Sequence, residues 1–291
     1  ETNVPHKDNV AYFGDGENEA QMVYQFSLPP LVLHAVHCQD VRTLSQWAAS
    51  LTLPSTKTTW FNFLASHDGI GLNPLRGILP EPEILSLVEK LQAEGALVNW
   101  KNNPDGTRSP YEINVTYLDA LSTRNSPDSQ RIARFILAHA VLLSFPGVPA
   151  VYIQSILGSR NDYAGVERLG YNRAINREKY TAGQIDSELE DKNSLRSQVY
   201  CSLSQLIALR RAEKAFHPDS EAYFSASGEH VLKIVRVAGC GEKITALFNF
   251  SDSIQTVESD IQSGNDLITG NDITDKKLTL HPWQVLWIKE N

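Results

Sequence analysis

The spacing of apolar residues predicts alternating strands and helices over the first 214 residues of this 291-residue chain. Short, mostly apolar runs at 21–28, 59–65 and 148–153 are typical of buried strands. Amphipathic stretches follow them at 31–53 and 194–214, and a third runs from 127 to the break at Pro146. Strands that alternate with helices in this way indicate an α/β fold with a parallel sheet.

The pattern changes at about Phe216, where apolar residues begin to recur at every second position. Ile244, Ala246 and Phe248 illustrate this alternation, which is typical of half-buried antiparallel strands. We therefore expect the second half of a (β/α)8 TIM barrel at 1–215, with four β/α units, and an antiparallel all-β domain at 216–291.

An insertion interrupts the expected barrel at about 69–121. It is predicted to contain one helix near 81–94 and a polar loop at 101–109, where Pro104, Asp105 and Gly106 favour a turn. The stretch 135–153 approaches the length of a membrane span, but Pro146, Gly147 and Pro149 interrupt it. A helix, a tight turn and a buried strand explain that stretch better.

Composition narrows the range of partners. The chain has 42% hydrophobic and 21% charged residues, a net charge of −8 and no cluster of Lys and Arg, which argues against nucleic acid or an anionic membrane as a partner. Its three cysteines are isolated and form no CxxC motif, so we expect a reducing, cytoplasmic location.

The candidate chemistry begins at the end of the strand predicted at 59–65. His67 and Asp68 follow that strand directly, and Gly69 and Gly71 permit a close turn of the backbone. In a parallel barrel, catalytic residues lie at this end of the strands. A His-Asp pair can also be a helix cap or a hydrogen-bonded turn, so the pair alone is weak support for catalysis. His6, His34 and His139 lack metal-ligand spacing, and no metal site is expected.

Five motifs occur in a fixed order and give the pair its context. They are ETNVPH at 1–6, YQFSLPPL at 24–31, SHDGIG at 66–71, SPYEIN at 109–114 and RAINRE at 173–178. Together they resemble the sucrose phosphorylase group of glycoside hydrolase family 13, the α-amylase superfamily. The resemblance extends from the end of the fifth barrel strand to the C-terminal β-domain.

The resemblance implies catalytic roles for three residues. Glu1 matches the general acid/base at the end of the fifth strand. His67 and Asp68 match the pair that binds the glucosyl hydroxyls and stabilises the oxocarbenium-like transition state. The nucleophilic aspartate of the family belongs at the end of the fourth strand, which would precede Glu1. Because retaining transfer needs both carboxyl groups, we expect this chain to begin within a larger protein and to be inactive alone.

Three further residues are implied to bind substrate. Tyr111 and Glu112 lie in the insertion after the seventh strand, near the acceptor, and Arg173 lies in the loop after the eighth strand, where phosphate or acceptor is held. A guanidinium group suits an oxyanion there. Sucrose-specific members carry an amide where Glu112 stands and an acid where Ser109 stands, so the acceptor is left open among fructose, glycerate, glycerol and a phosphorylated sugar.

The expected activity is that of a retaining α-glucosyl phosphorylase. It would use inorganic phosphate as co-substrate and no cofactor, and would release α-glucose 1-phosphate and the acceptor. Two alternatives remain: a hydrolase of the same superfamily, in which water replaces phosphate, and a non-catalytic carbohydrate-binding fragment. The expected partners are the glucoside, phosphate, and either the missing N-terminal half or a second copy of the chain.

Overall fold

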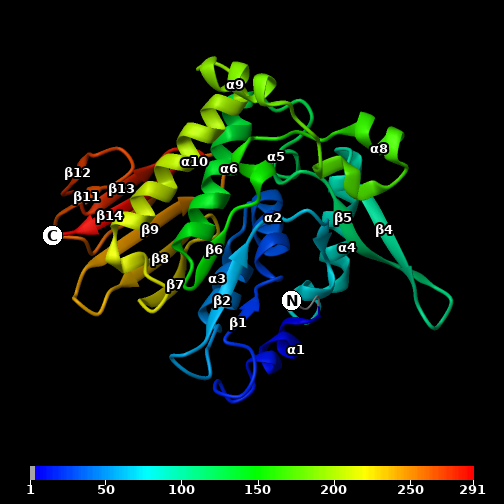
Figure 1. The fold of residues 1–291 in the computed structure, drawn as a ribbon. Coiled ribbons are helices and arrows are strands. Elements are labelled where there is room, and N and C mark those ends of the chain that lie inside the picture. Colours follow the sequence, from blue (N-terminus) through cyan, green and yellow to red (C-terminus); the bar gives the residue numbers. More distant parts are fainter. Residues whose placement is uncertain (1–3) are drawn as a thin grey trace.

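A parallel three-stranded sheet forms the centre of the protein in a computed structural model that describes residues 4–291 (Figure 1). Its strands are β1 (Met22–Tyr24), β2 (Thr59–Phe63) and β6 (Val148–Ala150), in the order β1-β2-β6. Both pairings are parallel, as expected for strands joined by helical crossovers. None of the helices in the described part of the chain is long and apolar enough to cross a bilayer.

The three strands lie where the apolar runs predict them, although each is shorter. Within residues 4–291 the sheet has three parallel strands, so the expectation of four complete β/α units is wrong for this part of the chain. The helix expected at 31–53 is also wrong, because two helices occur there, α2 (Leu28–Cys38) and α3 (Arg42–Ala49). Gln39 ends the first in the left-handed conformation, with φ of 53°.

The insertion contains a β-hairpin that the sequence did not predict. β4 (Leu97–Asn102) and β5 (Arg108–Asn114) are antiparallel, and β3 (Ile70–Gly71) pairs with the other edge of β5. The polar loop expected at 101–109 therefore includes the ends of both strands, and Figure 1 shows this hairpin projecting from the body of the molecule. The helix expected near 81–94 is confirmed as α4 (Glu81–Ala93).

Helices cover the sheet and connect it to the C-terminal part. α6 (Asp128–Ser144) and α10 (Leu195–Ala212) lie where the sequence predicts them and pack against each other (Figure 1). The segment 158–181 contains α8 (Tyr163–Leu169) and the 3-10 helix η3 (Asn172–Asn176). The remaining helical elements are α1 (His6–Val10), η1 (Ala11–Phe13), η2 (Asn73–Leu75), α5 (Tyr117–Ala120), α7 (Ile153–Ile156), α9 (Ala182–Glu190) and η4 (Lys214–Phe216).

Antiparallel strands make up the C-terminal part, as the change of period predicts. Its main sheet has the order β12-β11-β14-β9-β8-β7, and β10 pairs with β13. The strands are β7 (Glu221–Ser227), β8 (Val231–Val237), β9 (Lys243–Asn249), β10 (Gln255–Glu258), β11 (Gly264–Asp266), β12 (Asp272–Ile273), β13 (Lys277–Leu280) and β14 (Val285–Glu290). One apolar core contains side chains from α6, α10 and this sheet, including Leu142, Leu203 and Phe248.

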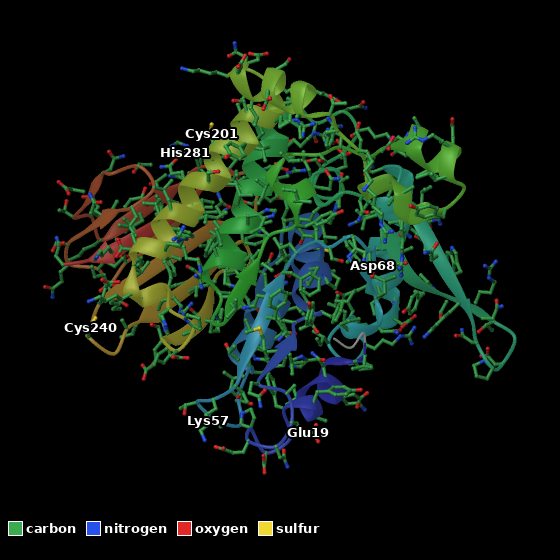
Figure 2. The ribbon with its side chains drawn as sticks, viewed as in Figure 1. Glu19, Lys57, Asp68, Cys201, Cys240 and His281 are labelled. Carbon is green, nitrogen blue, oxygen red and sulfur yellow. The ribbon has the colours of Figure 1, made fainter. Side chains whose placement is uncertain are left out.

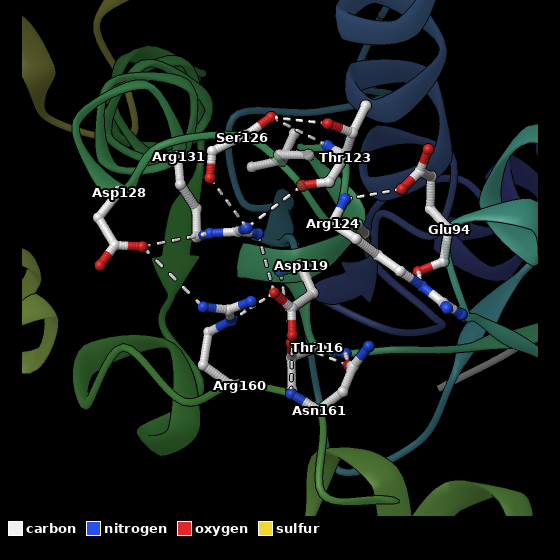
Figure 3. A network of polar contacts seen from close by, with 12 residues as sticks. Glu94, Thr116, Asp119, Thr123, Arg124, Ser126, Asp128, Arg131, Arg160 and Asn161 are labelled. Carbon is white, nitrogen blue, oxygen red and sulfur yellow. Dashed lines mark hydrogen bonds and ion pairs between the residues drawn. The ribbon is translucent and has the colours of Figure 1, made fainter.

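A network of hydrogen bonds and ion pairs holds the segment that follows β6 in place (Figure 3). The Asp119 carboxylate accepts hydrogen bonds from Nη1 of Arg131 at 2.9 Å, from Nε of Arg160 at 2.5 Å and from the backbone N–H of Asn161 at 2.8 Å. Asn161 in turn accepts from the backbone N–H of Thr116 at 2.8 Å. The segment after β6 is thus held to α5, to α6 and to the end of the insertion, before it reaches η3.

Candidate active site

The predicted site residues come together around the carboxylate of Asp68, which follows the end of β2. Figure 2 places Asp68 on the side of the molecule that carries the insertion hairpin, away from the C-terminal sheet. Two guanidinium groups donate to the same oxygen, Oδ1: Nη1 of Arg173 at 2.7 Å and Nη2 of Arg177 at 3.0 Å. Charge-assisted hydrogen bonds of this kind fix a carboxylate in place. Glu1 lies outside the described residues.

Arg173 connects Asp68 with the second predicted carboxylate, Glu112. Its Nε lies 3.1 Å from Oε1 and 3.2 Å from Oε2 of Glu112. Burial opposes the charged form of the guanidinium. The hydrogen bond to Glu112 and the charges of Glu112 and Asp68 outweigh burial and raise the pKa of Arg173 above its ordinary value. Arg173 therefore joins residues of three motifs: Glu112 precedes it by 61 positions in sequence and Asp68 by 105.

Tyr111 is the extra residue of a β-bulge. Glu112 pairs with Asn99 and Pro110 pairs with Trp100, so Tyr111 has no partner of its own on β4. A bulge turns a side chain away from its regular position in the strand and is frequent beside active sites. The Tyr111 side chain is half-buried, and it lies near enough to Arg173 to affect the pKa of that guanidinium.

His67 is less tightly held than Asp68. Its side chain is 66% exposed, and its Nε2 lies 3.6 Å from Oδ1 of Asp68, beyond hydrogen-bond distance. The backbone carbonyl of His67, by contrast, accepts a hydrogen bond of 2.6 Å from Nε of Arg177. The imidazole is therefore free to turn toward a ligand.

Two neighbours of Asp68 were not singled out from the sequence. Arg177 contacts Asp68 and His67, as described above. Asn176 is buried, and its Nδ2 donates to the carbonyls of Ser66 at 3.2 Å and of Asp68 at 3.0 Å. Both residues belong to the motif RAINRE, in which the spacing of four between the two arginines could have suggested a shared face.

The arrangement can bind an oxyanion but offers little net charge. Two guanidinium groups face two carboxylates, and each guanidinium keeps one terminal nitrogen outside the hydrogen bonds of the described residues: Nη2 of Arg173 and Nη1 of Arg177. Such nitrogens can donate to phosphate or to a carboxylate. Residues 4–291 contain no group of three or more His, Cys, Asp and Glu side chains arranged to hold a metal ion.

Comparisons with known proteins agree with the motifs. No family model matches the chain. A glucosylglycerate phosphorylase of Escherichia coli (strain K12) is 67% identical over 289 residues, which cover 99% of this chain and 52% of that protein. A sucrose phosphorylase of Agrobacterium vitis is 31% identical over 224 residues, which cover 74% of this chain and 42% of that protein. The chain therefore spans about half the length of the curated relatives it matches.

Solved structures share the fold. A sucrose 6F-phosphate phosphorylase from Thermoanaerobacter thermosaccharolyticum matches with a TM-score of 0.72 at 20% identity, over 96% of this chain and 51% of that chain. An α-amylase from H. orenii matches with a TM-score of 0.64 at 13% identity, over 100% of this chain and 52% of that chain. The fold is therefore the second half of an α-amylase-type TIM barrel with its antiparallel C-terminal part, and the chain is similar in sequence to part of the glucosylglycerate and sucrose phosphorylases.

Proposed function

We propose that the protein carrying this chain is a retaining α-glucosyl phosphorylase, which converts an α-glucoside and inorganic phosphate into α-glucose 1-phosphate and the freed acceptor. The observation that carries the proposal is the convergence of three motifs on one carboxylate. Asp68 from SHDGIG is held by Arg173 and Arg177 from RAINRE, and Arg173 also binds Glu112 from SPYEIN. These are the motifs on which the resemblance to the phosphorylases rests.

We propose glycerate as the acceptor, and hence a glucosylglycerate as the substrate. The relative with 67% identity is named for this activity. Glycerate and phosphate are both oxyanions that would leave or enter at the same position. Nη2 of Arg173 and Nη1 of Arg177, which make no hydrogen bond within residues 4–291, suit either of them.

Retaining glucosyl transfer requires two carboxyl groups close to the substrate, a general acid/base and a nucleophile. Glu1 would protonate the leaving oxygen, while an aspartate supplied from outside this chain would attack C1 to form a glucosyl-enzyme. Phosphate would then displace that aspartate after giving its proton to Glu1. Asp68 and His67 would bind the glucosyl hydroxyls and stabilise the positive charge of the transition state. Tyr111 and Glu112 would belong to the acceptor side of the site.

We propose that a further half-barrel supplies the nucleophile. β1 and β6 are each paired on one side within the described part of the chain, and barrels leave no such edges. The rings of Tyr24, Phe26 and Phe61 are partly exposed beside one another at the open sheet and would be covered in a closed barrel. A second copy of the chain is the alternative partner.

We also propose a cytoplasmic location, which fits the free thiols at Cys38, Cys201 and Cys240.

The test is phosphate-dependent turnover in the complete protein. With glucosylglycerate as substrate, glucose 1-phosphate should form in proportion to the phosphate supplied. Release of glucose at the same rate without phosphate would instead support a hydrolase. Asp68→Asn should reduce kcat by roughly 10²–10³-fold, the effect of losing one charge contact made in the transition state. Asp186→Asn changes an exposed acid on α9 in the same way and should leave kcat unchanged.

Arg173→Ala separates the two activities. We expect it to weaken the use of phosphate far more than the hydrolysis of the glucosyl-enzyme, because water needs no cationic partner. Arg108→Ala, on the exposed part of β5, is the matched control. Equal losses of phosphorolysis and hydrolysis would remove the support that Arg173 gives to the phosphorylase assignment.

A further inference from the structure

Glu112 is a buried carboxylate whose two oxygens are both occupied by protein groups. Its side chain is 4% exposed. Oε1 accepts a hydrogen bond of 2.7 Å from the backbone N–H of Gly69, and Oε2 accepts one of 2.9 Å from Nδ2 of Asn99. Nε of Arg173 approaches both oxygens. A carboxylate enclosed by three donors has little capacity left for an acceptor molecule.

All three groups around Glu112 are donors, which makes the identity of this side chain important. A carboxylate only accepts hydrogen bonds, whereas a glutamine amide offers one acceptor and two donors. In Glu112→Gln, Oε1 could still accept from Gly69 and lies 3.1 Å from Nε of Arg173, but the new NH₂ group would replace Oε2 and face the NH₂ group of Asn99. Two buried donors facing each other cost a hydrogen bond and leave both groups unsatisfied.

The orientation of Asn99 has a consequence on the other side of the site. Because Nδ2 of Asn99 points at Glu112, its Oδ1 is free to accept a hydrogen bond of 2.7 Å from Nδ2 of Asn172. Asn172 is the first residue of η3, which also carries Arg173 and leads directly to Arg177. Glu112 therefore holds η3 in two ways, directly through Arg173 and indirectly through the pair of amides.

We propose that Glu112 is a positioning residue of the proposed phosphorylase and does not contact the acceptor. This inference rests on the proposed function. Glu112 holds Arg173 by Nε and fixes the turn at Gly69, so that Nη1 of Arg173 stays on Asp68. Nη2 of Arg173 then remains available for an oxyanion, whether phosphate or the carboxylate of glycerate. The negative charge of Glu112 also balances the positive charge of Arg173. Oxyanion binding therefore depends on the hydrogen bond that Nη2 of Arg173 donates, and Glu112 fixes the direction of that nitrogen.

The first test compares Glu112→Gln with the wild-type complete protein, and uses Glu89→Gln on the exposed face of α4 as a matched control. We expect kcat to fall on the order of 100-fold, the effect of misplacing a reacting group by about 1 Å. Phosphorolysis of glucosylglycerate and phosphate-free hydrolysis of an activated glucosyl donor should fall together, because both need Asp68. A change confined to the KM for glycerate, with kcat unchanged, would identify Glu112 as an acceptor ligand and overturn the proposal. A change confined to phosphate would do the same.

The second test exchanges the acid and the amide. In Glu112→Gln combined with Asn99→Asp, the new carboxylate at 99 accepts from the amide at 112 and from Nδ2 of Asn172. The net charge and the hydrogen bonds of Gly69, of residue 99 and of Asn172 are thereby retained, and Nε of Arg173 keeps its 3.1 Å approach to Oε1 of residue 112. We expect the double variant to recover most of the kcat that Glu112→Gln loses. If Glu112 instead bound the acceptor directly, the double variant would not recover kcat, because its carboxylate would lie at residue 99 and not at residue 112.

A third readout does not depend on activity. Hydrogen exchange of the Gly69 amide should be faster in Glu112→Gln than in wild type and slow again in the double variant. Unchanged exchange of Gly69 in Glu112→Gln would refute the positioning role. If the wild-type protein shows no phosphate-dependent turnover, the proposed function fails, and the exchange data alone then decide whether Glu112 holds this turn.

Discussion

His139 should make the stability of the protein depend on pH below neutrality. It lies in α6 with 1% of its surface exposed, and its ring packs against that of Phe135 at a centroid distance of 4.0 Å. Its Nδ1 lies 2.9 Å from the carbonyl of Phe135, and Tyr117 covers another side of the ring. Burial lowers the pKa of His139 from 6.5 to about 4, and the hydrogen bond to the carbonyl offsets this only in part.

The sign and size of the effect follow from proton binding. Between about pH 6.5 and pH 4, the unfolded chain binds a proton at His139 and the folded protein does not, so stability falls as the pH falls. The two pKa values differ by about 2.5, and each pH unit is worth about 1.36 kcal/mol, so the full loss is about 3.4 kcal/mol. At about pH 5 the loss is about 2 kcal/mol, and near pH 7 it is almost zero.

Urea unfolding of wild type and His139→Gln at about pH 7 and about pH 5 measures this contribution. Glutamine does not titrate, so the wild type should lose about 2 kcal/mol more than the variant between the two conditions. His281→Gln changes an exposed histidine (Figure 2) and is the matched control for the substitution itself. Only the difference between wild type and His139→Gln is assigned to His139. Identical dependence in wild type and His139→Gln would show that the fold accepts the proton and refute the reasoning.

Two further predictions concern the packing that supports the site. Arg236 is fully buried and donates five hydrogen bonds to backbone carbonyls, two of them at the end of α6, so Arg236→Met should lower the free energy of unfolding by about 2–4 kcal/mol. Urea unfolding checks this, and an unchanged midpoint would contradict it. Gly147 has φ of 112° and directs its missing Cβ at the carbonyl of Trp60, whereas Gly241 has φ of 88° with no atom within 4 Å. Thermal unfolding should therefore show a larger loss for Gly147→Ala than for Gly241→Ala, and equal losses would mean that only the backbone conformation matters.

The sequence located the strands of the central sheet from their apolar composition. The strands at 59–65 and 148–153 are apolar runs bounded by turn residues, and both are confirmed. The hairpin at 97–114 was missed because β4 has only intermediate and exposed positions and therefore lacks the alternation that marks a half-buried strand. The break between α2 and α3 was missed for a different reason. Apolar positions recur across it with helical spacing, and Gln39 in the left-handed conformation carries no distinctive sequence signal.

The motifs predicted which residues belong to the candidate site, but not which contacts those residues make with one another. Asp68 and His67 could be found together because they are neighbours in sequence at the end of a strand. The contacts that orient Asp68 join residues 105 and 109 positions apart, and a single sequence does not contain those pairings. Glu112 illustrates the limit most clearly. Its motif placed it near the acceptor, but only coordinates distinguish a carboxylate facing the acceptor from one enclosed by three donors.

The enclosure of Glu112 also bears on how an acidic protein would bind anions. The chain has a net charge of −8, so its overall field repels phosphate and glycerate. Within the cluster, Arg173 and Arg177 are balanced by Asp68 and Glu112, so no local excess of positive charge attracts an anion either. Binding would then depend on N–H groups held in fixed directions, which are worth more where water is excluded than in solution. A buried acid beside the proposed anion site is then no contradiction: the negative charge of Glu112 would lower the net positive charge there, but would hold the guanidinium of Arg173 in one orientation.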